Sequence, residues 1–111
     1  MGIDCQLHRA SVDTSRGFRQ FQKADKALYD DKVDSAVRHL NKGLDYFDSA
    51  LGHLAKAEDD AYKKAGSEID KGNKELKKSI DEYGNGKTDS AASHYAKALD
   101  DYDAALDLIG G

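Results

Sequence analysis

Two histidines, His39 and His94, occupy equivalent positions in two similar segments of the chain, 55 residues apart. A neutral imidazole carries a lone pair that can bind a transition metal or accept a phosphoryl group. The heptad pattern described below places both side chains on the outer face of their helices, where core packing does not explain them. The alternative is that both were inherited from one ancestral unit and are merely solvated. His53 follows His39 by two heptads, so the candidate metal ligands are His39, His94 and His53.

The spacing of these histidines is too wide for chelation by one helix. His39, Tyr46 and His53 form a stripe with about 10 Å between successive members. A tight site needs ligands three or four residues apart or on facing helices, and the chain has no His-x-x-His, His-x-x-x-His or His-Glu-x-x-His. Carboxylates of neighbouring helices would have to complete any metal site, which predicts weak or interhelical binding.

A repeat determines the architecture that must position these side chains. Residues 34–51 and 89–106 are identical at ten of eighteen positions. The chain has no proline, and helix-favouring residues dominate both segments. We therefore expect one domain, residues 1–111, built from two αα-hairpins, about 1–55 and about 56–111. Short connections favour an all-α, up-down-up-down antiparallel four-helix bundle.

Apolar residues at alternating spacings of three and four define one buried seam in each copy. In the second and fourth expected helices these residues are Val37, Leu40, Leu44, Phe47, Leu51 and Leu54, and Ala92, Tyr95, Leu99, Tyr102, Leu106 and Ile109. Small residues flank both seams and should let a neighbouring helix approach closely: Ala36, Gly43, Ala50, Ala91, Ala98 and Ala105.

The first and third expected helices show the same pattern more weakly, because Asp25 and Asn73 fall in the seam. Burying either side chain is costly unless it is hydrogen-bonded. We favour a local rotation of these helices that presents Ala24 and Gly72 to the core instead. A buried polar contact that sets the register is the alternative.

Turn signals separate the expected helices. Residues 84–86, Gly-Asn-Gly, form the clearest break, and Thr88 or Asp89 should cap the helix that follows. In the first copy, Asp31 and Asp34 can form a capping box.

The junction between the copies, residues 55–60, lacks glycine and proline but carries Glu58, Asp59 and Asp60 as an acidic first turn. A continuous helix over 34–83 is the alternative there. It would give three helices and a dimer that swaps halves, so the chain is expected to be a monomer or a swapped dimer.

Charge and composition exclude several functions. The net charge is −4, and the lysine-rich third helix is interleaved with carboxylates, so nucleic acid is not an expected partner. Cys5 is the only cysteine, which excludes an intramolecular disulfide and a four-cysteine zinc site. No apolar stretch is long enough to span a membrane. No nucleophile with a base, phosphate-binding glycine loop or apolar carboxylate pair can be assembled, so we expect no enzyme.

Each copy resembles the repeat of the small metal-binding protein family. Members of that family are histidine-rich periplasmic four-helix bundles. Residues 86–89 lead to His94, residues 32–34 lead to His39, and residues 72–80 are similar to the preceding helix of that repeat. The resemblance implies divalent-metal binding, with copper, nickel or zinc as the ion. It implies a periplasmic location if a signal peptide was removed; otherwise the location is cytoplasmic.

This chain departs from the family pattern at most of the ligand positions. Lys32 and Lys87 stand in the turns, and Tyr46 and Asp101 stand one heptad after His39 and His94. A shared scaffold without its imidazoles indicates the fold more than the function.

Residues 39–43, His-Leu-Asn-Lys-Gly, resemble the His-x-x-Lys-Gly motif of histidine phosphotransfer domains, which are also four-helix bundles. The resemblance implies that Lys42 neutralises a phosphoryl group and that Gly43 leaves room for a response regulator. Asn41, Leu44 and Ala98 depart from that pattern. The alternative function is therefore a signalling module that uses His39.

A third interpretation is a bundle that binds another protein through its second and fourth helices. Tyr46 lies beside Asp45 and Asp48 and is a candidate anchor for such an interface.

Overall fold

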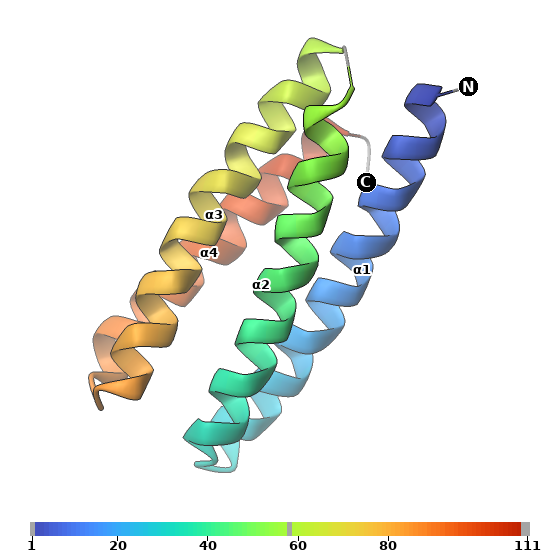
Figure 1. The fold of residues 1–111 in the computed structure, drawn as a ribbon. Helices are drawn as coiled ribbons and strands as arrows, with labels where there is room; N and C mark the ends of the chain where they lie inside the picture. The colour runs from blue at the N-terminus through green and yellow to red at the C-terminus, as the bar shows by residue number, and fades with distance from the viewer. Residues whose placement is uncertain (1, 58, 110–111) are drawn as a thin grey trace.

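The computed structural model describes residues 2–57 and 59–109, with side chains from Cys5 onward. These residues form α1 (Gly2–Tyr29), α2 (Val33–Ala55), α3 (Asp60–Gly84) and α4 (Thr88–Leu108). The helices alternate in direction and lie side by side in an elongated bundle of 45 × 19 × 18 Å (Figure 1). The predicted up-down-up-down four-helix bundle is confirmed. The alternative helix over 34–83 is wrong, because α2 ends at Ala55 and α3 begins at Asp60.

The turns inside the two hairpins have the same backbone conformation. Gly86 has a φ of 76°, and Asp31, which is its equivalent in the first copy, has a φ of 59°. The break predicted at residues 84–86 is confirmed, since α3 ends at Gly84. Aspartate is among the few residues with a side chain that tolerate this left-handed region.

The predicted helix caps are only partly correct. Asp59 caps α3, and its Oδ1 accepts a hydrogen bond from the Ala61 amide at 2.8 Å. Glu58 lies outside the described residues. The caps predicted at Asp31 with Asp34 and at Thr88 or Asp89 are wrong. The capping positions of α2 and α4 are Lys32 and Lys87, and neither makes a side-chain cap hydrogen bond.

Three aromatic rings from three helices form the centre of the core. Phe47 and Tyr102 are stacked with ring centroids 3.9 Å apart, and Phe21 stacks on both, at 5.6 and 5.7 Å. The Tyr102 hydroxyl donates to Asn73 Oδ1 at 2.7 Å, and Asn73 Nδ2 donates to Asp48 Oδ1 at 2.8 Å. The stack and these bonds connect all four helices.

Small residues hold the helices of each hairpin close together. The six residues predicted to flank the seams are buried, which agrees with close approach: Ala36, Gly43, Ala50, Ala91, Ala98 and Ala105. A Cβ at Gly43 would lie 2.3 Å from the Phe21 ring, and one at Gly72 would lie 2.5 Å from the Tyr102 ring. Ala92, which was predicted to face the core, is exposed, because α4 presents Ala91 there instead.

The two polar seam residues have different outcomes. Asp25 is exposed and Ala24 is fully buried, so the favoured rotation is confirmed for α1. For α3 the favoured rotation is wrong. Gly72 is buried, but Asn73 is buried too, with 2% of its surface exposed. The bonds to Tyr102 and Asp48 satisfy the Asn73 amide and offset the cost of burying it.

None of the four helices in the described residues combines the length and the apolar composition that a membrane span requires.

Candidate functional site

His39 and His94 make the same interhelical contact in their two hairpins. The Nδ1 atom of His39 lies 2.8 Å from Gln20 Oε1, and the Nδ1 atom of His94 lies 2.6 Å from Glu75 Oε2. Both partners come from the preceding helix and are themselves 55 residues apart. The outer-face placement predicted for these histidines is wrong: both rings are half-buried between the helices of their hairpin.

The second nitrogen of His94 is also in contact with a carboxylate. Its Nε2 lies 3.1 Å from Glu82 Oε1, one heptad after Glu75. A carboxylate only accepts hydrogen bonds, so the two glutamates together occupy both sides of the ring. The hydrogen bond from His94, followed by the charges of Lys78, His94 and Lys97, holds the pKa of Glu75 below its usual value, although burial acts in the opposite direction. His94 therefore has a carboxylate at each of its two ring nitrogens.

His39 lacks the second carboxylate and adjoins a cavity instead. The residue equivalent to Glu82 is Ala27, which removes the carboxylate from this position. A cavity of about 240 Å³ adjoins both Ala27 and His39. Its lining consists of Lys23, Lys26, Ala27, Asp30, Lys32, Ser35 and His39. Three lysines and one aspartate make this cavity positive overall.

The environment of His39 favours a neutral ring with a free Nε2. Burial and the positive charges of Lys42, Arg38 and Lys23, in that order of effect, lower the pKa of His39 from its usual 6.5. Because Gln20 Oε1 can only accept, Nδ1 carries the ring proton, and the lone pair is left on Nε2. An unprotonated nitrogen beside several cations is a suitable nucleophile for an anionic phosphorus centre.

The lowered pKa of His39 predicts a pH effect on stability. The folded protein binds a proton at His39 less readily than the unfolded chain, so stability is retained above the unfolded pKa of 6.5 and decreases as pH falls below it. In His39→Gln, the decrease in the urea midpoint on acidification should become smaller. The measurement is urea unfolding on both sides of that pKa, with His8→Gln, an exposed histidine in α1, as the control. An unchanged pH dependence in His39→Gln would contradict the prediction.

Heptad rows of mostly polar residues on α1 and α3 face the histidines and were not identified from the sequence. On α1 the row contains Gln6, Asp13, Gln20 and Ala27, and on α3 the equivalent residues are Ala61, Glu68, Glu75 and Glu82. The spacing of seven could have revealed both rows, since it matches the spacing of His39, Tyr46 and His53. The row is mostly neutral in the first copy and acidic in the second.

His53, on α2, contacts the α1 row at the opposite end of the hairpin. Its Nδ1 lies 2.8 Å from Gln6 Oε1, and its Nε2 lies 3.6 Å from Asp13 Oδ2, a buried atom that has no hydrogen-bond partner. Tyr46, the candidate interface anchor, is half-buried and lies between His39 and His53 along α2. His53 is thus brought together with α1 and not with His39.

Gly43 does not have the role that the phosphotransfer resemblance implied. It is buried beneath Phe21 in the core, so it cannot make room for a docking protein. Lys42 is exposed and acts on His39 through its charge. The feature that favours phosphoryl chemistry is therefore the cavity beside His39 and not the motif at residues 39–43.

The predicted metal ligands are not assembled into a metal centre. Within residues 2–57 and 59–109, no three or more histidine, cysteine, aspartate or glutamate side chains are grouped so that they could hold an ion. His94 has two glutamates nearby, but they lie at opposite nitrogens of its ring and do not converge on one point.

Comparisons with known proteins add no family assignment: no family model, curated protein or solved structure matches this chain. The resemblance to the small metal-binding protein family therefore stays a prediction.

Proposed function

We propose that the protein is a phosphoryl-accepting four-helix bundle in which His39 Nε2 is the acceptor atom. The observation that supports this proposal is the exchange of Glu82 for Ala27 between the two copies. In the second copy, a carboxylate lies 3.1 Å from His94 Nε2. In the first copy, a cavity lined by three lysines and one aspartate, Asp30, adjoins Ala27 and His39 and leaves room for a bound anion.

The chemistry follows from the contacts of the ring. The Nε2 lone pair would attack phosphorus, forming an N–P bond while the bond between phosphorus and the donor breaks and its electron pair leaves with the donor. The ring proton would stay on Nδ1, where Gln20 holds it at 2.8 Å. Lys23, Lys26 and Lys32 around the cavity would offset the negative charge of the phosphoryl oxygens.

The test is incubation of the protein with a small phosphodonor, acetyl phosphate or phosphoramidate, followed by mass spectrometry and peptide mapping. We expect an acid-labile, alkali-stable adduct of one phosphoryl group on His39. His39→Gln should lose the adduct and His94→Gln should keep it.

A reciprocal exchange gives a sharper control than removal of the histidine. Ala27→Glu should block phosphorylation by placing a carboxylate at Nε2 of His39. The equivalent pair in the second hairpin, Glu82 and His94, makes this contact at 3.1 Å. An adduct on His94 in the unmodified protein, or equal labelling of the Ala27→Glu variant, would contradict the proposal.

Metal binding at His39, His94 and His53 is the weaker alternative, since it has only the family resemblance in its support. Titration with copper, nickel or zinc tests it through the histidine ring signals in the NMR spectrum. The alternative fails if the ring signals of His39 and His94 do not shift at an equimolar concentration of metal.

A further inference from the structure

A groove separates α1 from α4, the two helices that close the bundle. No Cα atom of α1 lies within 8 Å of a Cα atom of α4 in the described residues, whereas the other neighbouring helices approach more closely. Rings bridge the gap: Phe21 and Tyr95 have centroids 5.9 Å apart, and Phe18 and Tyr102 have centroids 6.5 Å apart. Packed helices usually have axes about 8–10 Å apart, so the large aromatic side chains hold this pair open.

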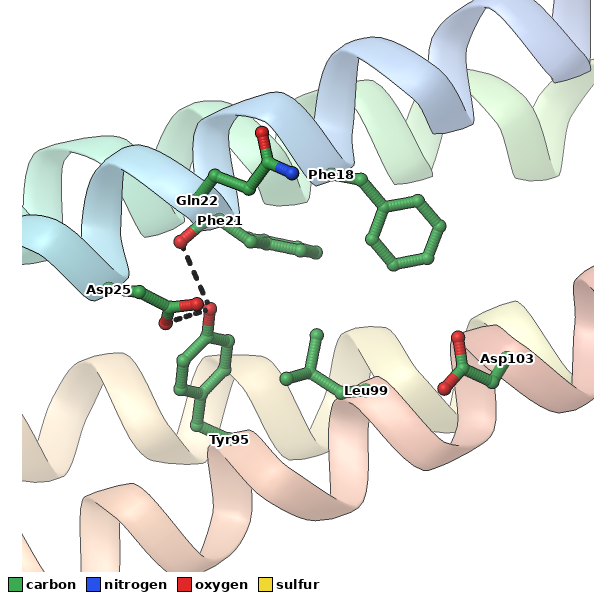
Figure 2. A pocket seen from close by; sticks show the side chains of 7 residues that line it. All are labelled: Phe18, Phe21, Gln22, Asp25, Tyr95, Leu99 and Asp103. Carbon is green, nitrogen blue, oxygen red and sulfur yellow. Dashed lines mark hydrogen bonds between the residues drawn. The ribbon is translucent and has the colours of Figure 1, made fainter.

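The groove is lined by both apolar and polar side chains. It encloses about 380 Å³ and is lined by Phe18, Phe21, Gln22, Asp25, Tyr95, Leu99 and Asp103. Figure 2 shows the Leu99 side chain pointing from α4 into the space between the helices, with Phe18 across from it on α1. Both of these side chains are only half-buried, so apolar surface remains uncovered in the groove.

Two carboxylates lie at opposite ends of the groove. Asp25 is near Tyr95 at one end, and Asp103 is near Phe18 at the other (Figure 2). The Tyr95 hydroxyl donates to Asp25 Oδ1 at 2.8 Å and thereby orients that carboxylate. Among the described residues, no lysine, arginine or histidine forms an ion pair with either aspartate. The lysines of α1, Lys23 and Lys26, line the cavity beside His39 on the α2 side instead.

We propose that this groove binds a basic amphipathic helix supplied by a partner protein. The apolar stripe of that helix would cover Phe18 and Leu99, while lysine or arginine side chains on its flanks would reach Asp25 and Asp103. The partner would then lie as a fifth helix between α1 and α4. The negative charges of Asp25 and Asp103 favour a basic helix over an acidic one.

The lysine-rich helix of a second copy, α3, does not have the required surface. It buries its apolar residues in its own core, including Ile69, Leu76 and Tyr83. The exposed side of α3 carries lysines without an apolar stripe beside them. We therefore assign the groove to a helix of a different protein and not to α3 of a second copy.

The experiment uses the full chain and two fluorescent synthetic peptides. One is a helical peptide of leucine, alanine and lysine with a single apolar stripe, and the other has glutamate in place of every lysine. By fluorescence anisotropy at low salt, the basic peptide should bind and the acidic one should not. Binding should weaken as salt is added, because the pairs at the groove ends are exposed to solvent.

A double variant tests whether the peptide binds in the groove. Asp25→Asn with Asp103→Asn keeps the shapes of both side chains and should weaken binding about fivefold, as expected for two exposed ion pairs. The matched control, Asp45→Asn with Asp100→Asn, removes the same charge from other exposed positions and should bind like the unmodified protein.

Several results would overturn the proposal: equal binding of the two peptides, equal weakening in both double variants, or concentration-dependent self-association that blocks the peptide. Tighter binding of spermidine than of the peptide would assign the groove to a small ammonium ligand and would equally overturn it. The proposal does not depend on phosphorylation of His39, which should be unchanged in either double variant.

Discussion

Replacing Tyr102 with alanine should lower the free energy of unfolding by about 4 kcal/mol, which is within the range for truncating a buried aromatic residue. The Tyr102 ring is fully buried in the stack with Phe47 and Phe21, and its hydroxyl bonds to Asn73. Truncation would leave a cavity at the place where the two hairpins meet. Ordinary domains have a free energy of unfolding of about 5–15 kcal/mol, so this variant should lose a large part of its stability. Urea denaturation followed by circular dichroism measures the loss.

One further variant separates the hydroxyl of Tyr102 from its ring, and another serves as a control. Tyr102→Phe keeps the ring and leaves Asn73 Oδ1 without its donor, so it should cost only about 1–2 kcal/mol. Tyr29→Ala removes a tyrosine that is 89% exposed and should change stability by no more than about 0.5 kcal/mol. A loss in Tyr102→Ala no larger than that in Tyr102→Phe would show that the ring stack contributes little.

Gly43→Ala should be the second large effect, with a loss of about 2 kcal/mol from overpacking. Alanine normally stabilises a helix interior relative to glycine by about 1 kcal/mol, so helix propensity alone predicts the opposite sign. The new Cβ would meet the Phe21 ring at 2.3 Å. Phe21 cannot move aside freely because it is stacked against Phe47 and Tyr102.

The same substitution elsewhere in α2 provides the control. Gly52 has no atom within 4 Å of the position where a Cβ would be placed, so Gly52→Ala should raise stability by about 0.5–1 kcal/mol. Opposite signs for the two variants in parallel urea titrations would confirm that close packing, and not helix propensity, explains Gly43. Stabilisation by both would contradict that explanation.

The fold was largely predictable because its signal is repeated along the chain. The duplicated heptads at 34–51 and 89–106 predict helices of the right number and order and most of the core face, and residues 84–86 predict the sharpest turn. The two polar seam residues were harder to predict, because their burial depends on partners from other helices. Asn73 is buried because Tyr102 and Asp48 satisfy its amide, whereas no such pair of partners meets Asp25 in the core.

The candidate site was predicted less well than the fold. The sequence identifies His39 and His94 as equivalent, but the properties that distinguish them belong to the facing helix. Gln20 and Ala27 face one ring, and Glu75 and Glu82 face the other. A pattern along one helix does not show which residues oppose it across a hairpin until the register of the two helices is known.

The position of the ring stack also affects how the molecule folds. Phe21 and Phe47 come from the first hairpin and Tyr102 from the second, so neither hairpin contains the whole stack. Each hairpin alone would expose the apolar face that the other covers and would lack part of the aromatic stack. We therefore expect the two copies, although similar in sequence, to unfold together as one cooperative unit.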